Sequence, residues 1–244
     1  MLGIGRSLLQ GRAKKVFFNK YSLLLDGSDQ AVQIDGLANN FKKGTGTISA
    51  WVRPNSVDAS STWVHVAVDA NNFYRIWWHH SSTLIKGQIK SGGNNDLVQF
   101  EDTDFASSTD WYHVVMTWDT TANEMKLYVD NSLKETDGID NSGDFSASAF
   151  AVADIGKNGQ ADNAYWKGYI DEVSIFDQTL TAAQVSTLYN GGNPSEVEFS
   201  EFEDGLIGYY IFSEGSGTTT ADESETGGND GTLENAPSWS KIVP

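Results

Sequence analysis

The residues that could carry acid–base chemistry are carboxylates that stand close together in the sequence. The clusters are Glu101, Asp102 and Asp104; Asp171 and Glu172; Glu201 and Glu203; and Glu223 and Glu225. Hydrolysis of a glycosidic bond needs two carboxyl groups that approach the sugar from one face, about 5–9 Å apart. Asp171 and Glu172 are adjacent in an apolar stretch, so in a strand they are expected to point to opposite faces. We therefore predict that all of these carboxylates are solvated surface groups and that the chain is not an enzyme.

The sequence offers little for nucleophilic or soft-metal chemistry. It has no cysteine, which excludes disulfides, thiolate nucleophiles and cysteine-based zinc sites. The histidines are His65, His79, His80 and His113, and they show no spacing typical of metal ligands. His113 alternates with packed residues in a predicted strand, so a structural role is expected. No phosphate-binding loop or dinucleotide fingerprint is present.

One aromatic stretch, residues 72–80, has the composition of a carbohydrate site. With a period of two, Arg75, Trp77 and His79 share one face with Phe73, and the intervening residues share the other. An aromatic ring beside polar side chains can stack on a sugar and bind its hydroxyl groups. The alternative is that Trp77 belongs to the core between two sheets or contacts a partner protein.

The elements that must position these residues are short strands at intervals of roughly 8–12 residues, a spacing typical of β-sandwiches. Residues 111–119 and 125–133 are predicted to form a hairpin through residues 120–124. The one clear helix signal covers residues 181–190, where Thr181 and Gln184 make a capping box and Gly191 follows as the stop. The pattern predicts an all-β, two-sheet antiparallel sandwich with one short helix in its C-terminal half.

Three blocks carry a resemblance to a known family. They are SLLLDGSD at 22–29 with TISAWVRP at 47–54; WYHVVMTWD at 111–119 with LYVDN at 127–131; and YWKGYIDEVSIFDQTLTAAQV at 165–185. Together they resemble the laminin-G-like jelly roll of the concanavalin A-like superfamily. The resemblance implies a jelly-roll sandwich over residues 21–192. It is weak for function, because one fold hosts many functions.

The same resemblance implies a bound metal ion. Members of this superfamily often hold one structural calcium ion near the junction of the first and last strands. The oxygen donors expected there are Asp171, Asp222, Asn229 and Asp230. The alternative is an ordinary turn rich in Asp and Asn.

The C-terminal segment 205–244 resembles the segment that usually opens such a domain. We predict a permuted arrangement, in which this strand and loop complete the same sandwich after an acidic linker at 193–204. The alternative is a truncated second repeat. A permuted strand would cover a sheet edge that would otherwise be exposed.

Charge is divided unevenly along the chain, whose net charge is −17. The basic N-terminal arm, residues 1–20, has five basic residues and no acidic one: Arg6, Arg12, Lys14, Lys15 and Lys20. The acidic remainder is expected to repel nucleic acid and anionic membranes, while the arm can dock on an acidic partner. The alternative is that the arm is a solvated terminus. The N-terminus shows no signal peptide and no stretch is long enough to span a membrane.

This arrangement also resembles chains of tailed phages. That resemblance implies a virion component, such as a capsid decoration, fibre or tail protein, made in the host cytoplasm. Its partners would be other virion proteins or further copies of the chain. The leading interpretation is therefore a non-catalytic virion protein docked through its arm. The alternative is a calcium-assisted carbohydrate-binding or adhesion module with a polysaccharide partner.

Overall fold

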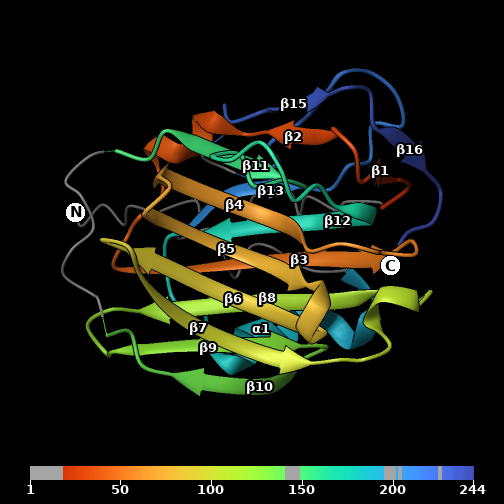
Figure 1. Ribbon diagram of the computed structural model, residues 1–244. Helices are drawn as coiled ribbons and strands as arrows, with labels where there is room; N and C mark the ends of the chain where they lie inside the picture. Colours follow the sequence, from red (N-terminus) through yellow and green to blue (C-terminus); the bar gives the residue numbers. More distant parts are fainter. Residues whose placement is uncertain (1–18, 141–148, 195–201, 203–204, 225–226) are drawn as a thin grey trace, which may run out of the picture.

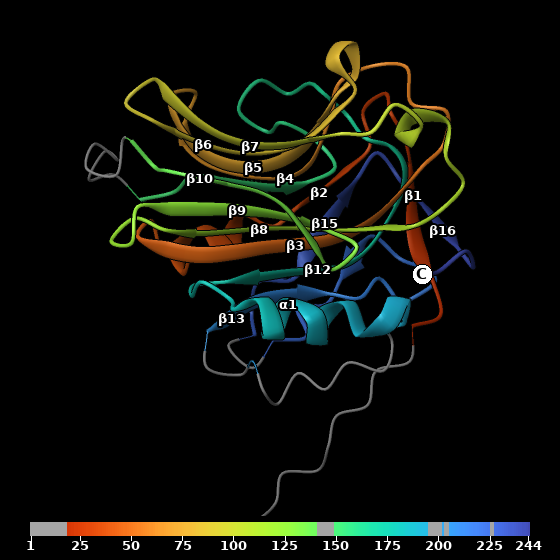
Figure 2. The ribbon, with the colours of Figure 1, turned by 90° about the horizontal axis from the view of Figure 1, so that it is seen from below.

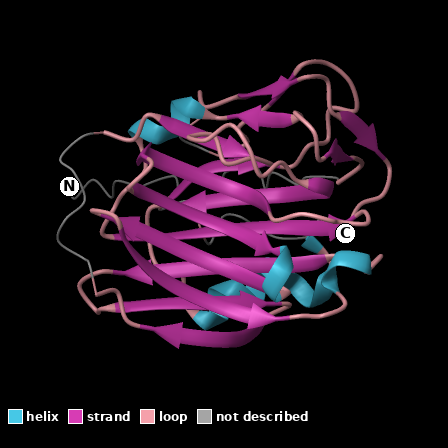
Figure 3. Ribbon diagram, viewed as in Figure 1, coloured by secondary structure: helices cyan, strands magenta, loops and turns pink. Residues whose placement is uncertain are grey.

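The structure, a computed structural model, describes residues 19–140, 149–194, 202, 205–224 and 227–244. Two eight-stranded antiparallel sheets face each other and form the predicted sandwich (Figure 1). Strands dominate the molecule, and helical segments lie only at its periphery (Figure 3). The predicted fold class is thereby confirmed.

We call the two sheets A and B. Sheet A has the order β10 (Ser132–Asp137), β9 (Glu124–Val129), β8 (Tyr112–Asp119), β3 (Thr45–Pro54), β12 (Lys167–Phe176), β1 (Ser22–Asp26) and β16 (Ser238–Ser240), and β13 (Leu206–Tyr210) also pairs with β12. Sheet B has the order β14 (Thr219–Thr220), β15 (Gly231–Glu234), β2 (Ala31–Gln33), β11 (Val152–Ile155), β4 (Ser61–Asp69), β5 (Asn72–His79), β6 (Leu84–Ser91) and β7 (Asn94–Glu101). The 3₁₀ turns are Asp35–Asn39, His80–Ser82, Phe105–Ser107 and Asn190–Gly192.

The core between the sheets follows the period-two pattern of the strands. On β5, Tyr74, Ile76 and Trp78 are fully buried in it, and on β8 Met116 and Trp118 meet them from sheet A. The rings of Tyr74 and Trp118 lie 4.7 Å apart, which joins the two sheets directly. Side chains of alternate residues therefore point away from the core, onto the outer faces.

Helix α1 (Ala182–Tyr189) covers the outer face of sheet A, on the side that faces away from sheet B (Figure 2). Its start confirms the predicted capping box, because Thr181 and Gln184 exchange side-chain and backbone hydrogen bonds. A second apolar cluster forms beneath the helix, where Val185 and Leu188 meet Val115 of β8. Among the described residues, no helix is long and apolar enough to cross a membrane.

The C-terminal segment contributes to both sheets. In sheet A, β13 pairs with β12 and β16 pairs with β1, while in sheet B β15 pairs with β2. The blue strands of this segment accordingly lie beside the red and teal strands of the domain in Figure 1. Residues 205–244 thus cover strand edges that the rest of the chain would leave unpaired. Most of the linker at 193–204 lies outside the described residues.

Candidate functional site

The outer face of sheet B around β5 is the first candidate site. Strands β5, β6 and β7 curve away from sheet A at both ends, so this face is concave (Figure 2). Arg75, Trp77 and His79 are half-buried on it, as the alternation predicts. The alternative that Trp77 belongs to the core between the sheets is wrong, because its neighbour Trp78 occupies that core instead.

Arg75 is held between aromatic rings at the centre of this face. Its guanidinium carbon lies 4.0 Å from the ring centroid of Trp77 and 5.1 Å from that of Phe73. Arg75 Nε donates a 2.7 Å hydrogen bond to Gln88 Oε1, and Gln88 Nε2 donates another of 2.7 Å to Asn95 Oδ1. These contacts fix the guanidinium group in one orientation. Burial lowers the pKa of Arg75 to about 10.

Two lysines of β6 share the face of Arg75, because each lies two residues from Gln88, which pairs with Arg75 in the strand register. Lys86 Nζ lies 5.5 Å from the ring of Trp77, and Lys90 Nζ lies 5.8 Å from the ring of Phe73. The ring of His79 lies 5.2 Å from that of Trp77. Burial lowers the pKa of His79, and the nearby charges of Lys86 and Arg75 lower it further. We name Phe73, Arg75, Trp77, His79, Lys86, Gln88 and Lys90 the aromatic–cationic face.

The loop of residues 156–166 borders the face on the side of β11. In the strand register, His65 of β4 stands opposite Arg75 of β5 on one side and opposite Asp154 of β11 on the other. His65 is fully buried, both its ring nitrogens lack a protein partner, and burial lowers its pKa to about 3. Burial also raises the pKa of Asp154 to about 7, although Lys157 Nζ lies 3.8 Å from its carboxylate. His65 and Asp154 are thus buried at this end of the face, whereas Arg75, Trp77 and His79 of β5 are half-buried.

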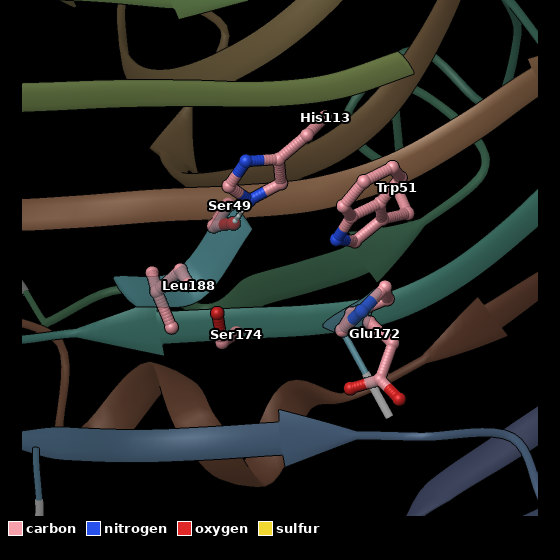
Figure 4. A pocket seen from close by; sticks show the side chains of 7 residues that line it. Ser49, Trp51, His113, Glu172, Ser174 and Leu188 are labelled. Carbon is pink, nitrogen blue, oxygen red and sulfur yellow. Dashed lines mark hydrogen bonds between the residues drawn. The ribbon is translucent and has the colours of Figure 1, made fainter. Parts of the chain in front are cut away.

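A small pocket beneath α1 is the second candidate site, on the outer face of sheet A (Figure 4). Ser49 Oγ and His113 Nε2 are 2.8 Å apart in it, and the ring of His113 stacks on Trp51 at 4.9 Å. Burial lowers the pKa of His113 to about 3, so its imidazole is neutral at pH 7. The free space is about the size of one water molecule. This pocket is too small for a sugar, and His113 has the structural environment predicted for it.

The structure corrects the prediction for Asp171 and Glu172. Both are buried, at 0% and 4% exposure, and neither is a solvated surface group. The register of β12 against β3 shifts between Asp171 and Ser174, and Glu172 has a φ of 46°. Such a β-bulge interrupts the alternation of side chains. Both carboxyl groups therefore lie on the outer side of sheet A instead of on opposite faces.

These two acids are held by residues from the N-terminal end of the described chain and from the C-terminal segment. Asp171 Oδ2 accepts a 2.9 Å hydrogen bond from Asn19, and Glu172 accepts one from the hydroxyl group of Tyr209 on β13. Burial raises the pKa of both carboxyl groups, and for Asp171 the charge of Glu172 adds to the effect. Both acids are thus stabilised in the protonated form.

The predicted calcium ligands are only partly brought together. Asp222 Oδ2 accepts a 3.0 Å hydrogen bond from Asn229, and Asp230 Oδ1 accepts one of 2.9 Å from the backbone of Asp222. Asp222 Oδ1 accepts backbone hydrogen bonds from Tyr209 and Ser224, so both its oxygens already face N–H donors. Asp171 is bonded elsewhere. In the described part of the chain, no group of three or more His, Asp or Glu side chains is placed to hold a metal ion.

Of the predicted docking residues, only Lys20 falls within the described residues, and its backbone N–H donates to Ser213 Oγ. Arg6, Arg12, Lys14 and Lys15 lie outside them. The prediction also missed Lys86, Gln88 and Lys90 of the aromatic–cationic face. Their alternation along residues 84–91 was the available signal, but which strand pairs with β5 is set by the tertiary structure.

Comparisons with known proteins agree with the geometry. Residues 26–186 match the family described as the concanavalin A-like lectin/glucanases superfamily. No curated protein sequence matches the chain significantly. Many solved structures resemble it, among them the three below, and at their low identity the likeness concerns the fold.

The first is a putative carbohydrate binding protein from Bacteroides ovatus, with a TM-score of 0.58 and 14% identity over 93% of this chain and 59% of the other. The second is the NanB sialidase from Streptococcus pneumoniae, with a TM-score of 0.55 and 18% identity over 70% of this chain and 27% of the sialidase. The third is a heptameric SAP-like pentraxin from Limulus polyphemus, with a TM-score of 0.50 and 18% identity over 72% and 83%. The chain thus spans about a quarter of the sialidase and most of the pentraxin.

Proposed function

The chain belongs to the concanavalin A-like lectin/glucanases superfamily, and from this premise we propose that it is a non-catalytic carbohydrate-binding protein. Its site would be the aromatic–cationic face. The observation that carries the proposal is the environment of Trp77, a partly exposed ring on a concave sheet with Arg75 and Lys86 beside it. A flat aromatic ring flanked by hydrogen-bond donors is the arrangement that binds the face of a sugar.

The exposure of the Trp77 side chain supports the same site. Its indole Nε1 is buried, whereas the side chain as a whole is half-buried, so the ring is the part that a sugar could meet. The Bacteroides ovatus protein, described as a putative carbohydrate binding protein, adds support at the level of the fold.

The absence of catalysis is part of the proposal. The paired acids Asp171 and Glu172 lie on sheet A beneath α1 and β13, whereas the aromatic–cationic face lies on sheet B. Carboxyl groups that hydrolyse a glycosidic bond must flank the bound sugar. The calcium ion expected from the family resemblance stays a prediction, and the proposed face does not depend on it.

The role in a virion also stays a prediction. It depends mainly on arm residues outside the described part of the chain. Deletion of residues 1–20 is expected to abolish incorporation into particles while the sandwich stays folded. Incorporation of the shortened chain would show that the arm is not the anchor.

A glycan array tests the proposed function. The wild-type chain is expected to be retained on a subset of bacterial or algal polysaccharides, and Trp77→Ala is expected to abolish this retention. Trp111→Ala is the matched control, since Trp111 is another half-buried tryptophan with a buried unpaired indole nitrogen, located beside Tyr169 of sheet A. Retention equal to wild type after Trp77→Ala, or no retention of the wild type on any glycan, would contradict the proposal.

A further inference from the structure

The guanidinium group of Arg75 can donate further hydrogen bonds through its two terminal nitrogens. Its one hydrogen bond to protein engages Nε, and its two terminal nitrogens have no partner among the described residues. Neither terminal nitrogen is among the buried polar atoms without a partner, so both are open to solvent. Their N–H groups lie in one plane and can donate two parallel hydrogen bonds to the oxygens of a carboxylate or sulfate.

The charge of Arg75 also lacks an internal counterion. No carboxylate of the described chain lies within ion-pair distance of Arg75, Lys86 or Lys90. The charge of Lys90 lowers the pKa of Asp69, but Lys90 Nζ donates its 2.9 Å hydrogen bond to the carbonyl of Ala70 and not to that carboxylate. A partly desolvated cation without a partner is costly unless an anion binds there.

Arg75, Lys86 and Lys90 form a local cluster of positive charge in a chain that is acidic as a whole. Only 16 of its 244 residues are basic, against 33 acidic ones, and the net charge is −17. A chain with this charge repels polyanions on average. Three basic side chains that converge on two aromatic rings of one concave face create a local exception, and they would confine an acidic ligand to this face.

We propose that the aromatic–cationic face selects acidic polysaccharides, with Arg75 gripping a carboxylate or sulfate group of a sugar whose ring stacks on Trp77. This inference rests on the proposed function and adds the chemical class of the ligand to it. Lys86 and Lys90 would interact with the neighbouring charged sugars of the same chain. Because Gln88 accepts a hydrogen bond from Nε, it would keep the two terminal nitrogens of Arg75 oriented toward the acidic group.

Two pairs of polymers test the proposal, because the members of each pair share a sugar backbone and only one of them carries the acidic group: dextran sulfate against dextran, and polygalacturonate against its methyl ester. Binding of the full chain is measured by isothermal titration at low and at physiological salt. The wild type is expected to prefer the acidic member of at least one pair by about tenfold or more. A preference in one pair only would identify the anion as sulfate or carboxylate.

Variants of Arg75 distinguish selectivity for acidic polysaccharides from carbohydrate binding in general. Arg75→Gln is expected to reduce the affinity for the acidic member to that for the neutral one, and Arg75→Lys to restore only part of the preference. The matched control is Arg53→Gln, because Arg53 also stacks on a ring, that of Tyr169 at 5.0 Å, and donates through Nε, but lies on β3 of sheet A. Arg53→Gln should bind like the wild type, and melting curves should show that all variants are folded.

The outcomes are distinguishable. Equal binding of acidic and neutral members overturns the acidic selectivity and leaves a carbohydrate-binding face in place. An equal loss after Arg75→Gln and Arg53→Gln overturns it as well, because binding would then reflect only overall charge. Tighter binding of a single-stranded oligonucleotide than of either acidic polymer would assign the face to another class of ligand. Failure of every polymer to bind, together with an empty glycan array, would contradict both proposals.

Discussion

The hydroxyl group of Tyr209 donates a hydrogen bond to the carboxyl group of Glu172, and thereby joins β13 to β12 through buried side chains. Both residues are nearly inaccessible to solvent. Burial raises the pKa of Glu172 and that of Tyr209. The hydrogen bond from Tyr209 partly offsets this rise for Glu172, but burial is the larger effect, so the site that attaches the C-terminal segment to sheet A is most stable when the acid is protonated.

Stability should consequently fall as pH rises through the range in which Glu172 ionises. The folded state keeps the proton above the ordinary pKa of 4.5, where the unfolded state releases it, so ionisation favours unfolding. Glu172→Gln cannot ionise and can still accept the hydrogen bond of Tyr209. Its free energy of unfolding relative to the wild type is expected to rise between pH 4.5 and pH 8 by at least about 1 kcal/mol.

Urea unfolding at the two pH values measures this difference. The exposed Glu101→Gln serves as the control and is expected to show the same difference from wild type at both. A constant difference for Glu172→Gln would mean that the acid is ionised in the folded protein.

Removal of the Gln88 side chain should weaken binding without disturbing the fold. Gln88→Ala leaves Arg75 between its two rings but removes the acceptor at Nε, so the guanidinium can rotate. We expect about tenfold weaker binding of the acidic polymer, with little change for its neutral partner. Titration of both polymers measures this, and Gln99→Ala on neighbouring β7 is the control. Unchanged affinity would show that stacking alone orients Arg75.

Loss of the N-terminal cap of α1 should destabilise this helix, which covers the second apolar cluster. Thr181→Ala removes the oxygen that accepts from the backbone of Gln184 and should lower the free energy of unfolding by about 1 kcal/mol. Thr181→Ser retains that oxygen and should behave like the wild type. Thermal or urea unfolding of the three chains measures the effect, which should not extend to binding, because α1 lies on the sheet opposite the proposed face.

Removal of residues 205–244 should prevent cooperative folding. The deletion strips β13 from β12, β16 from β1 and β15 from β2, and it exposes Glu172 to water without its partner. Unpaired edges of this kind promote aggregation. Size-exclusion chromatography and near-ultraviolet circular dichroism are expected to show aggregated chain without fixed aromatic packing. The chain that lacks residues 1–18 is the control, and a folded monomer of the longer deletion would contradict the expectation.

Local sequence determined much of this molecule. The period of two along residues 73–79 separated Tyr74 and Trp78 from Arg75 and Trp77, because alternation is a property of any strand, but only the structure showed that Tyr74 and Trp78 face the core. The helix start at Thr181 was predicted for a similar reason, since a capping box involves only four consecutive residues.

The tertiary structure decided the rest. The bulge at Glu172 arises from the register of β12 against β3, and it buries two acids that alternation alone would separate. The partner of Arg75 is Gln88 because β6 pairs with β5 in one register, and a shift of one residue would turn Gln88 and both lysines into the core. Alternation is a local property of the chain, whereas register, bulges and burial depend on contacts between distant segments, and these contacts form only when the sandwich closes.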